Sequence, residues 1–372
     1  MRSFVRHLKI CTPDQLEDQM DKITYNPTSP GYRVSLDKRI MGLDELRGIA
    51  ALLVVVAHWC CIWPTIGNWK IGAIGVDVFF IISGFLIGSI LIRSRGESGF
   101  FRTFFVRRAF RIIPLAAMMV ALGVLVHLLK GMSLESLPYY LTFTQNFIPV
   151  FRFNHELTSL SITPLIGTSP MWSLAVEEHT YIALPFLFFF LSEKKIKYAA
   201  GAIALTGCAF TIYYWAKSSP GEWYTNHRET WARMHYIAFG VLLIKREYLP
   251  IAATTLASWL FATAIFSPEG IGQVLLAMLI TATIFAIKEQ KLQISSSILK
   301  WIGLRCYGVY LLHYPISRIA MEAYDKGWMH STSNQIMAFI AYIGLTLLAA
   351  FLSFKYFEMP IQMQRSRFEP ER

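Results

Sequence analysis

The sequence has little charge for its length. Of its 372 residues only 16% are charged, whereas 54% are hydrophobic and the mean hydropathy is +0.43. A soluble domain of this size carries about 25% charged residues, so the shortage argues against a soluble enzyme and indicates a membrane protein. The net charge of +11 comes from basic residues strung between apolar runs rather than gathered on one compact domain. We therefore expect no nucleic-acid partner.

Cysteine is also scarce. The chain has five cysteines, with no Cys-x-x-Cys pair and no histidine at metal-ligand spacing: Cys11, Cys60, Cys61, Cys208 and Cys306. Four of them lie within apolar runs, where cysteine behaves as a small hydrophobe. We expect neither a disulfide framework nor a metal site. No signal peptide is visible, because the first strongly apolar run begins near Gly48, after a polar tail of roughly 40 residues.

What the chain does contain is a series of apolar runs. About ten of them approach the roughly 20 helical residues needed to cross a hydrocarbon core. The expected fold is all-α, a polytopic transmembrane helix bundle (41–360) between a polar N-terminal tail (1–40) and a short C-terminal tail (361–372). Residues 131–170 are expected to form an external loop. The expected spans are 46–66, 71–92, 112–130, 171–191, 198–216, 230–245, 250–267, 271–288, 298–319 and 335–356.

Lys and Arg alternate between rich and poor connections along the chain. By the positive-inside rule the rich connections are cytoplasmic, which predicts an even number of spans with both termini inside. The rich side holds Arg93, Arg95, Arg102, Arg107, Arg108, Arg111, Lys194, Lys195, Lys197, Lys245, Arg246, Lys288, Lys291, Lys300, Lys355, Arg365, Arg367 and Arg372. The poor side holds only the scattered residues Lys70, Arg152, Lys217, Arg228 and Lys326.

Five ionisable residues fall within or at the ends of the expected spans, where such groups are costly and usually functional. Arg47 opens the first span, and His58 follows eleven residues later on nearly the same face, about 16 Å further along the axis. Asp77, Glu177 and Glu178 enter their spans from the opposite side and lie about 9–10 Å deep. This brings them within about 5 Å of the depth of His58, so the depths predict one shared polar pocket.

Histidine is the commonest general base at neutral pH, and a neighbouring carboxylate would fix its tautomer and stabilise the imidazolium. No G-x-S-x-G nucleophile motif is present, which favours direct attack by an acceptor hydroxyl on a bound acyl donor. The depths leave open whether Asp77, Glu177 or Glu178 is the partner of His58. The alternative is that His58 merely forms a hydrogen bond with a neighbouring helix.

A basic cluster precedes the third span. Arg107, Arg108 and Arg111 share one helix face by their spacing, and several guanidinium groups on one face suit bidentate capture of phosphate. Ordinary positive-inside charge is the alternative. With Arg47 at the same entrance and His58 deeper along the same wall, the pattern fits a ligand with phosphates at one end and a reactive group on a long arm, such as acyl-CoA.

Other polar residues are weaker signals. Ser173, His179 and Tyr181 flank the glutamates and are candidates to line the pocket. Glu358 is expected to end the last helix at the cytoplasmic edge. The remaining histidines in apolar runs share no spacing with a carboxylate and are interpreted as interhelical hydrogen-bonding residues: His127, His235 and His313.

Several motifs together resemble the membrane-bound acyltransferase 3 family. They are LDELRGIAALLVVVAH (43–58), GVDVFFIISGFLI (75–87), FVRRAFRIIP (105–114), MWSLAVEEHTY (171–181), GLRCYGVYLLHYP (303–315) and Glu358 before Pro360. They occur in the family's order over roughly residues 41–360. As a set they are specific, although each alone is weak.

The resemblance implies about ten helices in the bacterial inner membrane, an acyl-CoA donor on the cytoplasmic side and acylation of sugars or other hydroxyl compounds. The family's Arg-x10-His pair falls on Arg47 and His58, and its Arg-x-x-Arg on Arg108 and Arg111. Its paired acids fall on Glu177 and Glu178. Two positions depart from the family pattern, His179 and Cys306. No hydrolase-like domain follows the last span, which predicts a stand-alone enzyme.

We therefore predict a membrane O-acetyltransferase acting on a cell-surface polysaccharide, lipopolysaccharide O-antigen or lipid-linked glycan precursor, with membrane lipid around it and no permanently bound cofactor. Acetyl-CoA would be the donor, its phosphates held by Arg47, Arg108 and Arg111, and His58 would be the general base. Two alternatives remain: a transporter or flippase that uses the buried His and acids as a proton relay, and a structural or sensing subunit.

Overall fold

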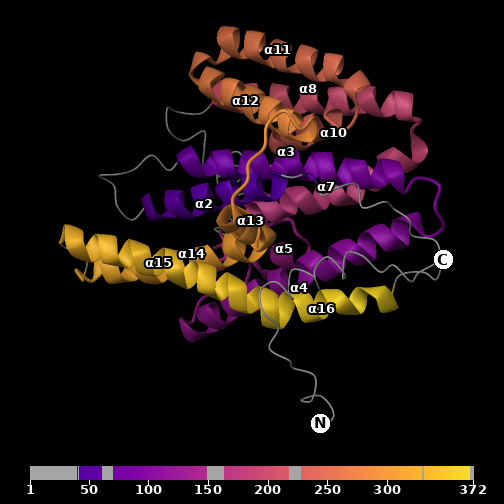
Figure 1. Cartoon of the computed structure of the whole chain (residues 1–372). Coiled ribbons are helices and arrows are strands. Elements are labelled where there is room, and N and C mark those ends of the chain that lie inside the picture. The colour runs from indigo at the N-terminus through magenta and orange to yellow at the C-terminus, as the bar shows by residue number, and fades with distance from the viewer. Residues whose placement is uncertain are drawn as a thin grey trace.

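The computed structural model describes residue 40 and residues 42–60, 70–148, 163–217, 228–328 and 331–368. Within these residues every regular element is a helix, as expected, and the longer helices run roughly side by side as a bundle (Figure 1). The expected tail 1–40 lies almost wholly outside the described residues.

The main helices are α2 (Leu43–Cys60), α3 (Lys70–Arg93), α4 (Phe100–Leu129), α7 (Met171–Phe190), α8 (Glu193–Lys217), α10 (Thr230–Leu242), α11 (Leu249–Phe266), α12 (Ile271–Lys288), α13 (Ser297–Leu304), α14 (Cys306–Asp325) and α15 (Thr332–Ser353). Shorter elements are α5 (Leu137–Leu141), η1 (Gln145–Phe147), η2 (Arg246–Tyr248), η3 (Pro268–Gly270), the π-helical turn η4 (Phe354–Glu358), α16 (Met359–Met363) and η5 (Gln364–Arg367).

Helix α3 lies at the centre, packed between α2 and α10. A layer of α8, α11 and α12 covers α10, while α4, α14 and α15 lie on the opposite side of α2 and α7 (Figure 1). Glycine permits the closest of these contacts. A Cβ at Gly84 would come within 1.9 Å of the Ile237 carbonyl oxygen, and one at Gly240 within 2.0 Å of the Ile81 carbonyl oxygen. The backbones of α3 and α10 therefore touch directly.

Six helical stretches of the described chain are long and apolar enough to cross a membrane: Gly72–Arg93, Phe100–Leu129, Glu193–Lys217, Arg246–Phe266, Pro268–Lys288 and Thr332–Met363. Several of them expose large apolar side chains, as α15 does with Met337, Ile340 and Leu345, a surface that suits lipid rather than water. The protein is a multi-pass membrane protein. The expected number of about ten spans, and the cytoplasmic location of both termini, remain predictions.

Two expected spans, the expected loop and the expected C-terminal tail differ from the structure. The third begins at Phe100 rather than near 112, because the basic segment continues the same helix. The span expected at 298–319 is two helices, α13 and α14, broken at Arg305. The expected loop 131–170 contains the short helices α5 and η1, and the expected C-terminal tail begins inside α16.

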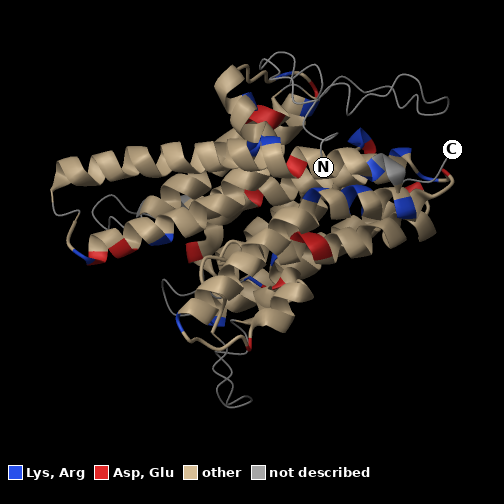
Figure 2. Cartoon of the chain, turned by 90° about the horizontal axis from the view of Figure 1, so that it is seen from below, with Lys and Arg blue, Asp and Glu red and all other residues tan. Residues whose placement is uncertain are grey.

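Lys and Arg gather toward one end of the bundle, the right-hand end in Figure 2. Two ion pairs join elements far apart in the sequence, Lys245 with Glu193 and Arg246 with Glu289. Burial is slight for most of these basic groups, so each ion pair contributes little to stability. Their collective effect is a positive field at this end.

Candidate active site

Three adjoining cavities follow one another along α2 and α14. The basic mouth, about 650 Å³, is lined by Arg47, Arg93, Arg111, Lys288 and Tyr307, among others. The central cavity, about 230 Å³, shares Arg47, Arg111 and Tyr307 with it. The distal cavity, about 380 Å³, contains His58 and Asp77 and shares Val76 and Tyr310 with the central one. Helix α14 contributes a tyrosine to each cavity in turn: Tyr307 to the mouth, Tyr310 to the central cavity and Tyr314 to the distal cavity.

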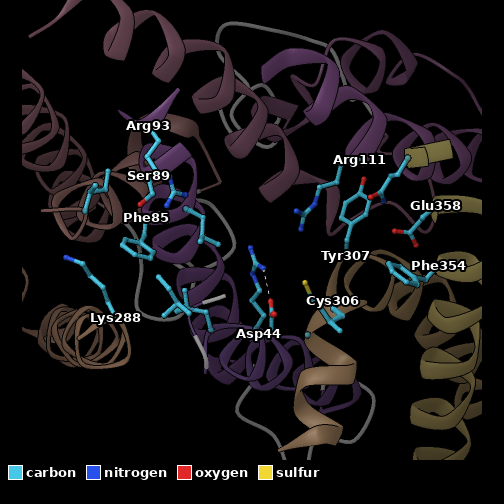
Figure 3. A pocket seen from close by; sticks show the side chains of 18 of the residues that line it. Asp44, Phe85, Ser89, Arg93, Arg111, Lys288, Cys306, Tyr307, Phe354 and Glu358 are labelled. Carbon is cyan, nitrogen blue, oxygen red and sulfur yellow. Dashed lines mark hydrogen bonds and ion pairs between the residues drawn. The ribbon is translucent and has the colours of Figure 1, made fainter. Parts of the chain in front are cut away.

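Basic side chains surround the mouth. In Figure 3 Arg93 and Lys288 lie on one side of the space, while Arg111 and Tyr307 lie across it. Glu358 lines the same wall and is buried in the π-helical turn, where it accepts a hydrogen bond from Ser353. The helical stretch does not end at Glu358, where the sequence predicted its end, but continues into α16. Several cations around a cavity open to solvent suit a polyanionic ligand.

The start of α2 explains how Arg47 is placed. The Glu45 carboxylate accepts a hydrogen bond from the Gly42 backbone N–H at 3.0 Å, which satisfies a free donor at the helix N-terminus. Asp44, one turn before Arg47, accepts from the Arg47 guanidinium at 3.2 Å. Acidic residues in the first turn also match the helix dipole. The local sequence thus fixes Arg47 at the junction of the mouth and the central cavity.

In the central cavity a carboxylate is held by hydroxyl groups. Glu177 accepts hydrogen bonds from Ser83 and from Tyr181, each at 2.8 Å. The Arg108 guanidinium lies over the Tyr181 ring, 5.3 Å from its centroid. Ser173 lines the same cavity and shares a 2.6 Å hydrogen bond with Tyr310. Five predicted residues therefore line this cavity together, besides Arg47: Arg108, Arg111, Ser173, Glu177 and Tyr181.

His58 lies in the distal cavity and contacts another histidine rather than a carboxylate. Its Nδ1 is 2.9 Å from the Val54 carbonyl oxygen and 3.3 Å from Nε2 of His313 on α14. His313 is fully buried, and its own Nδ1 faces the Val309 carbonyl oxygen at 3.2 Å. A neutral tautomer with the proton on Nδ1 satisfies these contacts in both rings. It leaves Nε2 of His58 as the nitrogen able to accept a proton.

Asp77 does not orient His58, contrary to one of the alternatives in the sequence analysis. Its carboxylate forms a buried ion pair with Arg233 of α10 at 3.6 Å. A buried carboxylate requires such a partner because an isolated charge is costly away from water. Asp77 and His58 line the same distal cavity, as their depths predicted. Glu177 lines the central cavity instead, so the one pocket expected for His58 and all three acids is not formed.

Glu178 and His179 lie away from these cavities. Glu178 is on the same helix as Glu177, yet it is not among the described residues that line them, and its buried Oε1 has no hydrogen-bond partner within the described chain. His179, a candidate pocket residue by sequence, instead stacks on Phe147 and shares a 2.6 Å hydrogen bond with Thr230. Of the neighbouring residues Glu177, Glu178 and His179, only Glu177 lines the central cavity.

Sequence reasoning missed two kinds of residue at this site. His313 was interpreted as an ordinary interhelical histidine, and Arg228 as scattered charge on the basic-poor side. The signal for Arg228 was available, because the positive-inside rule gives no reason for arginine there. No sequence signal paired His313 with His58, since the two are 255 residues apart.

Chemically, the cavities offer a cationic entrance, a central passage lined by hydroxyl groups and an imidazole with a free basic nitrogen. This set can bind an anionic carrier at one end and remove a proton at the other. Among the described residues no group of three His, Cys, Asp or Glu side chains could hold a metal ion.

Residues 40–355 match the family model described as an acyltransferase domain. The curated relatives include the peptidoglycan O-acetyltransferase of Listeria monocytogenes, which is 28% identical over 87% of this chain and 56% of its own length. A putative peptidoglycan O-acetyltransferase of Bacillus subtilis is 27% identical over 90% of this chain and 57% of its own. A putative O-acetyltransferase of Staphylococcus aureus is 26% identical over 87% and 58%.

The chain thus spans little more than half the length of these relatives. No solved structure matches it.

Proposed function

The chain belongs to the acyltransferase family whose model spans residues 40–355, and from this membership we propose that it transfers an acetyl group from acetyl-CoA to a hydroxyl of a cell-envelope saccharide. The observation that carries the proposal is the succession of cavities from the arginine-lined mouth to His58. The relatives named as peptidoglycan O-acetyltransferases support acetyl as the acyl group and a cell-wall glycan as one acceptor class.

The donor would bind at the basic mouth, on the cytoplasmic side of the inner membrane. Arg47 and Arg111 line both the mouth and the central cavity, so they can hold CoA phosphates through charge-assisted hydrogen bonds. Arg108 lies deeper, in the central cavity alone. The pantetheine arm is long and carries amide groups, which suit the hydroxyl-lined passage past Ser83 and Tyr310.

The acceptor hydroxyl would meet the thioester beside His58. Nε2 of His58 removes the hydroxyl proton as the oxygen attacks the thioester carbonyl carbon. The tetrahedral intermediate then collapses, the C–S bond breaks and the CoA thiolate takes the proton back from the imidazolium. His313 and the Val54 carbonyl oxygen hold the Nδ1–H tautomer that this step requires. His58 is thus the general base, positioned by a histidine.

The test uses purified full-length protein in nanodiscs with radiolabelled acetyl-CoA. Soluble peptidoglycan fragments and neutral oligosaccharides serve as acceptors, and base-labile label on the glycan is the product. We expect ester formation that depends on both the protein and the acceptor. CoA release without labelled glycan, or no reaction with any hydroxyl acceptor, would overturn the proposal.

A transporter remains the second candidate, because the adjoining cavities also suit a passage from one end of the bundle to the other. The same preparation, reconstituted in sealed vesicles, separates the two functions. Movement of labelled acetyl-CoA or glycan into the vesicles without covalent modification would favour transport.

A further inference from the structure

The distal cavity continues into a fourth space beyond His58. This loop pocket, about 250 Å³, is bounded by residues 164–169 and by the region after α5. It shares Ser169, Trp172, Arg228, Tyr314 and Arg318 with the distal cavity. The two form one joined space, which includes His58 and shares no lining residue with the basic mouth.

Two arginines line both parts of the joined space without a carboxylate partner. Within the described residues, no Asp or Glu is in ion-pair contact with Arg228 or Arg318. Arg318 contacts the Met321 sulfur at 3.0 Å. Arg233, in contrast, is neutralised by Asp77. The positive charge of Arg228 and Arg318 is therefore available to a ligand.

The structure holds the main chain in place at Arg228, although no described carboxylate forms an ion pair with its guanidinium. The Asn146 side chain is fully buried and donates to the Arg228 carbonyl oxygen at 3.2 Å and to Thr230 at 3.1 Å. The guanidinium lies over the Trp172 ring, 5.8 Å from its centroid. A half-buried guanidinium is costly unless an anion compensates it. Its fixed position therefore indicates a binding role.

Aromatic side chains complete this space. Trp172 and Tyr314 line both the distal cavity and the loop pocket, and the Tyr314 ring is 5.4 Å from the His58 ring. Flat rings with a polar edge pack against the C–H faces of sugar rings and offer hydrogen bonds to their hydroxyl groups. Guanidinium next to such rings suits a sugar that carries an acidic group.

We propose that the joined distal cavity and loop pocket form the acceptor site, and that Arg228, with Arg318, binds a carboxylate or phosphate group on the acceptor saccharide. This assignment rests on the proposed function, because it places a hydroxyl of that sugar at His58. It also gives the acceptor an entrance separate from that of the donor, so the two substrates approach His58 from opposite ends.

The experiment measures equilibrium binding without acetyl-CoA, so its result does not depend on transfer. The full chain in nanodiscs is titrated with three labelled disaccharides. The neutral probe contains only N-acetylglucosamine. The carboxylate probe has N-acetylmuramic acid in place of one N-acetylglucosamine, and the phosphate probe is the 1-phosphate of the neutral disaccharide. We expect at least one acidic probe to bind about tenfold to a hundredfold tighter than the neutral one. The better acidic arm identifies the group recognised.

Arg228→Gln is expected to remove this preference, and Arg228→Lys to retain part of it, since lysine keeps the charge but loses bidentate geometry. Lys130→Gln is the matched control, because Lys130 is an exposed cation paired with Glu322 and lies outside both cavities. Equal binding of neutral and acidic probes, or a preference that survives Arg228→Gln, would overturn the acceptor site. Selective binding without any acetyl transfer would instead overturn the proposed function alone.

Discussion

The basic mouth and the distal cavity are both lined by arginine, but different physical rules explain them. At the mouth, Arg93 and Lys288 belong to basic-rich segments of the sequence, where the positive-inside rule is enough to account for positive charge. In the distal cavity, Arg228 and Arg233 stand in a basic-poor region, half-buried or buried. Charge that topology does not require, and that burial penalises, is therefore the stronger indication of a binding site.

The substitution with the largest expected effect is at His58 and tests whether the reaction takes place in the distal cavity. His58→Gln should lower kcat about 10²- to 10⁴-fold, because the general base is lost, while the KM for acetyl-CoA stays close to that of the unmodified protein. Rates are measured at saturating donor and equal protein in nanodiscs. His179→Asn is the control, since His179 lies outside the cavities. Near-normal transfer by His58→Gln would show that the distal cavity is not the reaction site.

A second variant tests the mouth separately. Arg111→Ala should raise the KM for acetyl-CoA about tenfold or more, the usual loss when one charged hydrogen-bonding partner is removed, and leave the rate at saturating donor nearly unchanged. Lys291→Ala provides an exposed basic control at the same end that does not line the mouth. An unchanged KM for acetyl-CoA would show that Arg111 does not bind the CoA phosphates. The proposed difference between the basic mouth and the distal cavity would then fail.

A third variant separates positioning from chemistry within the distal cavity. His313→Asn should lower kcat about tenfold, because a general base whose tautomer is less well fixed removes the proton less efficiently, with little change in either KM. The pH profile of kcat should also shift, because the tautomer of His58 is no longer held by the 3.3 Å contact. A profile that matches the unmodified protein would assign His313 a purely structural role.

The smallest expected effect concerns Glu229, which precedes α10 beside Arg228. Burial raises the pKa of Glu229 to about 7, against the opposing influence of Arg233 and Arg228. Below that pH the carboxyl is neutral, and above it a negative charge competes with an acidic ligand for Arg228. Affinity for the acidic disaccharide should therefore fall severalfold as the pH rises through 7. The Glu229→Gln variant should bind the acidic disaccharide equally well below and above pH 7.

Local patterns predicted much of the geometry of the candidate site. The face shared by Arg47 and His58 follows from helix geometry, and the hydroxyl-held Glu177 lies in the cavity with Arg108 and Arg111. The pairings were less predictable, because the partner of a buried charge depends on helix rotation, which apolar runs leave open. Asp77 pairs with Arg233 of α10 rather than with His58. Glu178, next to Glu177 in sequence, does not line the cavities.

The sequence by itself determined that the chain is an all-helical membrane protein of the acyltransferase family, since hydropathy, charge placement and short motifs are local properties. Only the tertiary structure decided which side chains meet. The contact of His58 with His313 joins segments 255 residues apart, and the close approach of α3 to α10 at Gly84 and Gly240 likewise joins segments far apart in the sequence. Long-range packing is collective, so no single motif encodes it.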